Sequence, residues 1–385
     1  MKLPKTHELT LLARQGKLHE VPKYQLTEQA LTTRERSGYT VLHLCAIHGH
    51  LKSIPPEILA SNLLLYDGNG YSVIAEACAH GHLDQIPDEL LTQENMNEVI
   101  TYQGSAVEGW TPLALAIQQW DGRTKADPSG SASIIPKRFL TKENLIKEVG
   151  KVDVVKKGRP CGTTCYHVAA ISGMLNLLPL DEEVLRTKNA DKDTVFHVAA
   201  EHGTLDQIPY SLLTVENMTL LGADDETPLH TAGMMGHLEQ VPHAVMNDKT
   251  LAMQDSEGCS VLCRAAAGGI KHIPEHLLTM ENLSEQSKLG TPIYRAASTG
   301  FLADIPGKFL TLETMTNDGF QDHPALWFTN QWEAVPELSS KGWPALKLSR
   351  KQEWYAVFDK YKIDVPMRVS KSWQHLEEAG AWQAL

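Results

Sequence analysis

The chain of 385 residues lacks several features that would assign it to a familiar functional class. It has no run of 18 apolar residues, so we expect no membrane-spanning helix. Its N-terminal segment has no apolar stretch of the secretory-signal kind, and six cysteines are too few for a disulfide framework, so we expect a cytoplasmic protein. Phosphate-cradling glycines, a nucleophile elbow and a kinase motif are absent too, so no motif predicts an enzyme, a cofactor or a small-molecule substrate.

Positive charge is also scarce. The chain has 35 Lys and Arg against 47 Asp and Glu, a formal net charge of −12. Residues 337–385 hold eight basic and six acidic residues (+2), so residues 1–336 carry −14. Because nucleic-acid phosphates are bound by basic surfaces, this balance argues against general binding of DNA or RNA.

What the chain does contain is one motif in many copies. A Thr or Ser, here called the anchor, precedes an Ala-rich segment and a Gly, and Ile-Pro or Val-Pro follows six residues after that Gly. Clear copies are TVLHLCAIHGHLKSIP (40–55) and TPLHTAGMMGHLEQVP (227–242). The anchors are Thr40, Ser72, Thr111, Thr164, Thr194, Thr227, Ser260 and Thr291. A period near 32 residues predicts a solenoid, in which stacked neighbours share one core.

Each recurring residue has a physical role. The anchor hydroxyl can accept a backbone N–H at the start of a first helix, and the Gly supplies a left-handed helix end. The second Pro is expected to open a second helix, as in IPDELL (86–91). The Thr of the following LTxEN motif can then cap a further short helical turn.

The motif resembles the ankyrin repeat, whose pattern is G-x-T-P-L-H-x-A-A-x-x-G. The best matches are ETPLHTAGMMG, GTPIYRAASTG, GYTVLHLCAIHG and DTVFHVAAEHG, and the resemblance covers roughly residues 8–336. The second half, H-L-x-Q-I-P-x-x-L-L-T-x-E-N, looks like a bacterial variant of the family. The resemblance implies an all-α ankyrin-repeat solenoid of about ten helix-turn-helix units. The first unit, ending at Pro22, and the last, residues 323–336, are degenerate copies.

The resemblance also implies how the protein binds. Ankyrin repeats contact their targets through turn tips and the exposed face of the first helix. Carried over by position, the expected partner-binding residues are Tyr39, His48, Tyr71, His80, Trp110, Gln118, Glu201, His202, Met234 and Met235. Aromatic tips in three successive repeats suggest a binding strip, because Tyr and Trp dominate interface energetics. The alternative is that each ring folds back onto its neighbouring repeat.

Two insertions interrupt the array, near residues 119–131 and 147–161. The first is a polar Gly/Pro/Ser loop, QQWDGRTKADPSGSAS. The second carries Lys147, Lys151, Lys156, Lys157 and Arg159. It is either a solvated excursion or a basic finger that reaches a partner.

The segment 337–385 has a different composition. Six of the eight Trp lie in the last 59 residues, and two stretches read as amphipathic helices. Because a solenoid must cover the apolar face of its last unit, we expect a helical Trp-rich C-terminal cap. The alternative is a docking segment with exposed Trp side chains.

The many histidines and the cysteine pairs do not predict a metal site. His43, His167, His197 and His230 share one motif position, which predicts a structural hydrogen-bonding role. Cys161–Cys165 and Cys259–Cys263 each supply only two ligands, half of a zinc site.

We therefore expect a non-enzymatic module that binds a partner protein, with no metal or cofactor. An alternative is an acidic decoy or regulatory subunit that occupies a basic surface of a nucleic-acid-processing or defence protein. A third hypothesis, direct nucleic-acid binding through residues 147–159, has the least support.

Overall fold

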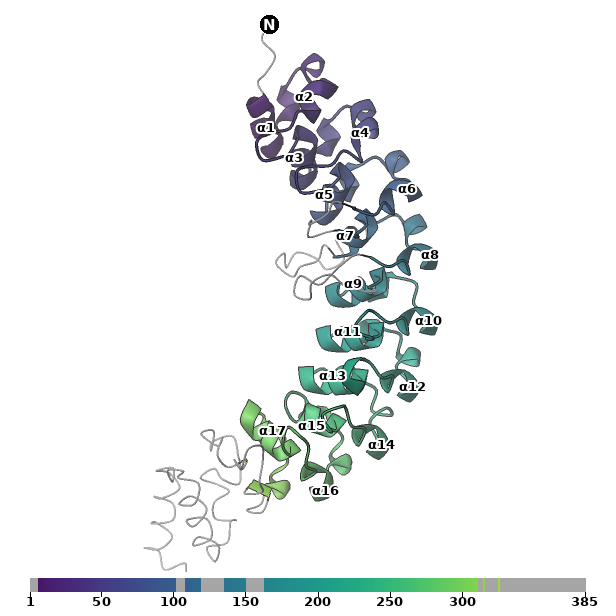
Figure 1. Cartoon of the computed structure of the whole chain (residues 1–385), viewed down its shortest axis with the longest axis vertical. Coiled ribbons are helices and arrows are strands. Elements are labelled where there is room, and N and C mark those ends of the chain that lie inside the picture. The colour runs from purple at the N-terminus through teal and green to yellow at the C-terminus, as the bar shows by residue number, and fades with distance from the viewer. Residues whose placement is uncertain are drawn as a thin grey trace, which may run out of the picture. The chain divides into compact units, whose positions relative to one another are not determined.

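A computed structural model describes residues 6–101, 108–118, 135–149 and 163–310, with residues 314, 315 and 325. The chain divides into two compact units, Met1–Ile208 and Pro209–Leu385. Each unit is an all-α stack of helix pairs of the ankyrin type, which confirms the expected fold class (Figure 1). Three expected features lie outside the described residues: nearly all of the two insertions, the last repeat copy and the Trp-rich segment 337–385.

The first helices stack in chain order within each unit (Figure 1). In the first unit they are α1 (Thr6–Arg14), α3 (Val41–His48), α5 (Val73–Ala79), α7 (Pro112–Gln118), α9 (Cys165–Ser172) and α11 (Val195–His202). In the second unit they are α13 (Pro228–Met235), α15 (Val261–Ala265) and α17 (Pro292–Thr299). These nine are the first helices that the described ranges contain.

The anchor and the Gly delimit most of the first helices as expected, whereas α15 ends at Ala265 without a left-handed Gly. The Thr40 hydroxyl accepts the backbone N–H of His43, and Gly49 ends α3 in the left-handed conformation with φ 73°. The same two features bound α13, where Thr227 caps the start and Gly236 (φ 81°) closes the end. Because both signals are local in sequence, the helix boundaries follow from the motif itself.

The second half of the repeat differs from the expectation of one Pro-opened helix. In most repeats the segment after the Pro is a 3-10 turn, such as Asp88–Leu90 after Pro87. Thr92 begins a new capped turn, α6 (Gln93–Met96), only five residues after that Pro, so an α-helix has no room to form. Where Ala60 stands five residues after Pro55, no such cap is present and the segment is a true second helix, α4 (Pro56–Asn62). Two other repeats lack the Thr, but Asp181 and Asn247 cap the short turn in its place.

The remaining second-half segments are equally short. The α-helical turns are α2 (Glu28–Thr32), α8 (Lys142–Leu145), α10 (Glu182–Leu185), α12 (Val215–Met218), α14 (Asp248–Leu251) and α16 (Met280–Leu283). The 3-10 turns are Leu18–Glu20, Lys23–Gln25, Leu51–Ser53, Leu83–Gln85, Lys137–Phe139, Leu175–Leu177, Leu205–Gln207, Tyr210–Leu212, Ala223–Asp225, Leu238–Gln240, Ile270–His272, Glu275–Leu277, Leu302–Asp304 and Gly307–Phe309. No β-strand occurs in the ranges described, only isolated bridges such as Tyr66 with Ser72.

The Asn of the LTxEN motif fastens this short turn to the segment before it. The side-chain amide of Asn217, which is 0% exposed, donates to the Leu212 carbonyl over 2.8 Å. Asn95 and Asn282 make the equivalent bond to Leu90 and Leu277. The sequence predicted the Thr cap, but it did not reveal this second function of the Asn.

The motif histidines are confirmed as structural. His230 is 1% exposed, and its Nδ1 accepts the backbone N–H of Thr227. Its Nε2 must therefore carry the ring proton, which it donates to the Met253 carbonyl over 2.9 Å. His43 lies 2.9 Å from the Leu65 carbonyl in the same way. Each ring thus ties a first helix to the loop that leads into the next repeat.

The shared core of each unit consists of buried aliphatic and Ala side chains of the first helices. In α3 the residues Val41 to Ala46 are all buried, and only the last two residues emerge. None of the helices in the described part of the chain is both long and apolar enough to cross a lipid bilayer. The fold therefore leaves the ends of the first helices and the turn tips as the surfaces that differ between repeats.

Candidate functional site

Most of the predicted binding positions at the first-helix ends face solvent. His48, His80, Gln118, Glu201, His202 and Met235 are exposed, and Met234 is partly exposed. Met234 and Met235 end α13 in the second unit, whereas the others belong to the first unit.

The turn tips do not behave alike. Tyr39 and Tyr71 are partly exposed, but Trp110 retains only 4% of its surface. The prediction that Trp110 presents its ring to a partner is therefore wrong. The backbone of this turn tip is held by a hydrogen bond, in which the Trp110 carbonyl accepts the N–H of Ile100 over 2.9 Å. Burial of so large an aromatic surface stabilises the repeat itself.

Three predicted residues of the first unit, Tyr39, Tyr71 and His80, interact with the carboxylate of Glu76, and His48 lies near His80. We call this set the N-terminal cluster: Tyr39, His48, Tyr71, Glu76 and His80. The Glu76 carboxylate is 3.2 Å from Nδ1 of His80, one helical turn further along. That contact outweighs burial and raises the pKa of His80. Glu76 is only 3% exposed, and this burial, above all, raises the pKa of its carboxyl.

The charge of the same carboxylate acts on the two tyrosines. Burial raises the pKa of Tyr71, and the charges of Glu76 and Asp67 act in the same direction. Tyr39 is affected by the same causes, and its hydroxyl accepts the side-chain amide of Asn69 over 3.0 Å. Burial also lowers the pKa of His48, helped by the charge of Arg14. The N-terminal cluster thus joins two aromatic rings, two imidazoles and a buried acid on one face.

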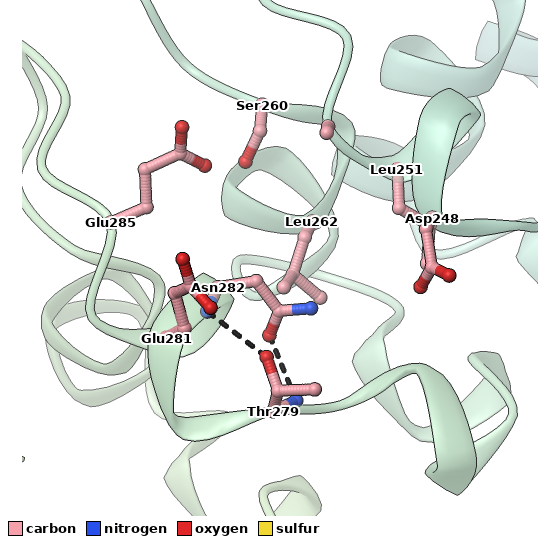
Figure 2. A pocket seen from close by; sticks show the side chains of 9 residues that line it. Asp248, Leu251, Ser260, Leu262, Thr279, Glu281, Asn282 and Glu285 are labelled. Atoms are coloured by element: carbon pink, nitrogen blue, oxygen red, sulfur yellow. Dashed lines mark hydrogen bonds between the residues drawn. The ribbon is translucent and has the colours of Figure 1, made fainter.

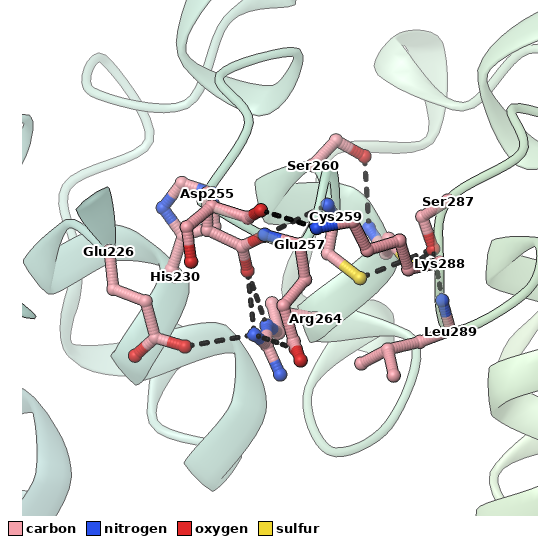
Figure 3. Close-up of polar contacts among 12 residues, drawn as sticks. Glu226, His230, Asp255, Glu257, Cys259, Ser260, Arg264, Ser287, Lys288 and Leu289 are labelled. Carbon is pink, nitrogen blue, oxygen red and sulfur yellow. Dashed lines mark hydrogen bonds and ion pairs between the residues drawn. The ribbon is translucent and has the colours of Figure 1, made fainter. Parts of the chain in front are cut away.

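A second polar cluster lies in the other unit, around Arg264 of α15. Its guanidinium is 2.7 Å from Asp255, 2.9 Å from Glu257 and 3.0 Å from Glu226 (Figure 3). Burial of Arg264 disfavours its charged form, but the carboxylates of Asp255 and Glu226 outweigh this and raise its pKa. Lys288 of the next repeat donates to the Ser256 carbonyl over 3.0 Å. These contacts join three successive turns.

Sequence reasoning missed both Glu76 and Arg264. A partial signal was available, because each stands four residues after its anchor. Half of the repeats have an apolar residue there, namely Leu44, Leu115, Val168 and Val198, whereas the other two exceptions are Thr231 and Arg295. A charged residue at such a position indicates a local polar network. Asp67 and Asp255, five residues before the same anchors, complete the two networks.

An acidic cavity of about 570 Å³ opens on the second-half segments of the second unit. The carboxylates of Asp248, Glu281 and Glu285 line it, over the apolar side chains of Leu251 and Leu262 (Figure 2). The capping pair of Thr279 and Asn282 forms part of its wall. Its lining suits a positively charged group.

The second cysteine pair lies beside the Arg264 cluster. Sγ of Cys259 donates to Oγ of Ser287 over 3.2 Å (Figure 3). Sγ of Cys263 is 3.6 Å from the same oxygen. The contact between the two thiols lowers the pKa of Cys259 and raises the pKa of Cys263. Cys259 is 0% exposed. Within the described ranges, no group of three or more His, Cys, Asp or Glu is placed to hold a metal ion.

Comparison with known proteins identifies no function. No protein-family model matches the chain, and no curated protein matches it. Among solved structures it is similar to the ankyrin repeat domain of Bcl-3, described as a unique member of the IkappaB protein family. The identity is 19%, the match covers 58% of this chain and 92% of that one, and the TM-score is 0.37. The ankyrin-type architecture is evident from this chain's own repeated caps, turns and helix pairs.

Proposed function

We propose that this protein is a non-enzymatic interaction module that binds another protein. The contact surface consists of the first-helix ends together with the turn tips Tyr39 and Tyr71. Trp110 is excluded from this surface because it belongs to the core. The partner is a protein rather than a nucleic acid, since residues 1–336 carry a net charge of −14.

One observation carries the proposal: the repeats are uniform inside and diverse outside. The interior of the first helices consists mainly of buried small or aliphatic side chains, as in Val73–Ala75 and Val198–Ala200. The exposed ends instead present His48, His80, Gln118, the Glu201–His202 pair and the Met234–Met235 pair. A stack that needed only to fold would have no reason to vary these ends, whereas a surface that recognises one partner must differ from repeat to repeat.

The test begins with the partner. The tagged full chain is purified from its native cells with nuclease present, at low and at high salt, and co-eluting proteins are identified by mass spectrometry. Binding of the purified partner is then measured for Tyr71→Ala. Because tyrosines at the centre of an interface typically contribute about 2 kcal/mol, we expect about a 30-fold loss of affinity. Tyr210→Ala is the matched control, since Tyr210 is 72% exposed but belongs to the 3-10 turn Tyr210–Leu212 rather than to a first helix.

The acidic-decoy hypothesis remains a second candidate, favoured by the carboxylates of the cavity around Asp248, Glu281 and Glu285. It predicts a basic partner whose binding weakens steeply with salt. The aromatic and helix-end surface predicts weak dependence on salt. A partner that stays bound at high salt but no longer binds Tyr71→Ala supports the first proposal. Equal binding by Tyr71→Ala and Tyr210→Ala would refute it.

A further inference from the structure

Two repeats, one in each unit, build the same turn around a buried aspartate. Asp67 is 2% exposed, and its Oδ1 accepts the backbone N–H groups of Asn69 and Tyr71 over 2.8 Å each. Asp255 is 6% exposed and accepts the N–H groups two and four residues on, over 2.8 and 3.0 Å. The two turns therefore have the same hydrogen-bonding pattern.

They differ at the residue that faces the aspartate. In the second unit this is Arg264, whose Nε donates to Asp255 over 2.8 Å (Figure 3). Its guanidinium also reaches Glu226, which directly precedes its anchor. The buried aspartate of the second unit is thus neutralised by a cation from its own chain.

In the first unit the same position is Glu76. Its carboxyl group lies in hydrogen-bonding contact with that of Asp67, so two buried acids face each other. Neither forms an ion pair with a Lys or Arg of the described residues. The nearest cationic group is the imidazole of His80, whose side chain is 43% exposed. Two adjacent carboxylates repel one another unless a cation lies between them or one of them binds a proton.

The rim of this acid pair is aromatic. Tyr39 directly precedes its anchor, and Glu226 occupies the equivalent position in the other unit. Tyr71 lies near Tyr39. Both rings lie near Glu76 and Asp67. A guanidinium is planar, binds carboxylates through two parallel hydrogen bonds and stacks on aromatic faces, whereas a lysine ammonium does neither as well.

We propose that the N-terminal cluster is the binding site for an arginine side chain of the partner protein. This arginine would give Asp67 and Glu76 the guanidinium that Arg264 gives Asp255, between the rings of Tyr39 and Tyr71. The exposed ring of His80 is the group that it displaces from Glu76. The inference rests on the proposed function and adds the chemistry that this face recognises.

A short peptide tests the site without knowledge of the partner. The probe is the acetylated and amidated peptide Gly-Ser-Arg-Ser-Gly, titrated into the full chain with labelled tyrosines and followed by NMR. Its control carries citrulline, which has the shape of arginine without the charge. We expect the arginine peptide to shift the ring signals of Tyr39 and Tyr71, and the citrulline peptide to leave them in place. Equal shifts with both peptides, or none with either, would overturn the proposal.

Two substitutions at one position sharpen the test. Glu76→Arg supplies the guanidinium from within the chain, as in the second unit, and should abolish the peptide-induced shifts. Glu76→Gln keeps the shape and removes one charge, and should weaken peptide binding by about tenfold or more. If Glu76→Arg does not fold by circular dichroism, Glu76→Gln decides. Unchanged peptide binding in a folded variant would refute the site.

The same variants separate this inference from the proposed function. If Glu76→Gln binds the purified partner as tightly as the natural chain while Tyr71→Ala does not, the interaction module stands and the arginine site fails. If neither change affects the partner, this face is not the interface, and both proposals fail.

Discussion

Acid should destabilise the first unit through His167, a buried histidine that the fold keeps neutral. His167 is 1% exposed, and its Nδ1 accepts the backbone N–H of Thr164 over 3.2 Å. Its Nε2 donates to the Asp193 carbonyl. Burial lowers the pKa of His167 to about 4, against the backbone hydrogen bonds that favour the charged ring. A proton on Nδ1 would turn the acceptor of the Thr164 N–H into a donor.

The sign and size of the effect follow from linkage. The unfolded chain has a histidine pKa near 6.5, so between about pH 6.5 and pH 4 the unfolded state binds more protons than the folded state. The contribution of His167 to the free energy of unfolding is therefore fully present above about pH 6.5 and is lost as the pH drops below it. One pH unit is about 1.4 kcal/mol, so His167 alone should lose about 2 kcal/mol of stability by pH 5 and about 3 kcal/mol by pH 4.

The assay is urea unfolding of the full chain, followed by circular dichroism at about pH 7.5 and about pH 5. His167→Gln should lower the free energy of unfolding at the higher pH by about 1–3 kcal/mol, because a buried hydrogen-bond network is broken. Its further loss between the two pH values should be smaller than that of the natural chain by about 2 kcal/mol. Part of the loss remains, because burial lowers the pKa of His43 and His230 too.

His202→Gln is the control for the substitution itself. His202 is exposed at the end of α11, so at about pH 7.5 its replacement should change stability by less than about 0.5 kcal/mol. The reasoning is refuted if His167→Gln loses as much stability between the two pH values as the natural chain. An NMR titration that places the His167 pKa near 6.5 would refute it independently.

Three further substitutions probe the packing. Gly236→Ala should cost more stability than Gly258→Ala. Both glycines have positive φ, but an added Cβ at Gly236 would lie 2.7 Å from the Gly268 carbonyl oxygen, and one at Gly258 meets nothing within 4 Å. We expect about 1 kcal/mol at Gly258 from backbone strain alone, and urea midpoints that separate the two variants. Trp110→Ala should lower the free energy of unfolding by about 3–5 kcal/mol, because its ring is buried. A melting temperature equal to that of the natural chain would refute the burial of Trp110.

Asp67 and Glu76 show which features the repeat pattern predicts and which it does not. The anchors align Glu76 with Arg264 and Asp67 with Asp255, so the sequence alone could have shown a charge reversal at one position. Only the structure shows that the two acids touch, that both are buried and that His80 lies 3.2 Å away. Burial and contact depend on side chains from other turns, and their rotamers are not encoded in spacing.

What the sequence determined by itself is local. Thr40 caps α3 and Gly49 ends it because a cap needs only its own side chain and a nearby N–H, and a left-handed end needs only the absence of a Cβ. The tertiary structure decided what depends on distant neighbours. The acceptor for His43 is Leu65, 22 residues away, and Trp110 is buried although Tyr39 and Tyr71 at equivalent tips are partly exposed. Position within a repeat fixes the backbone, whereas exposure is set by the side chains that the adjoining repeats supply.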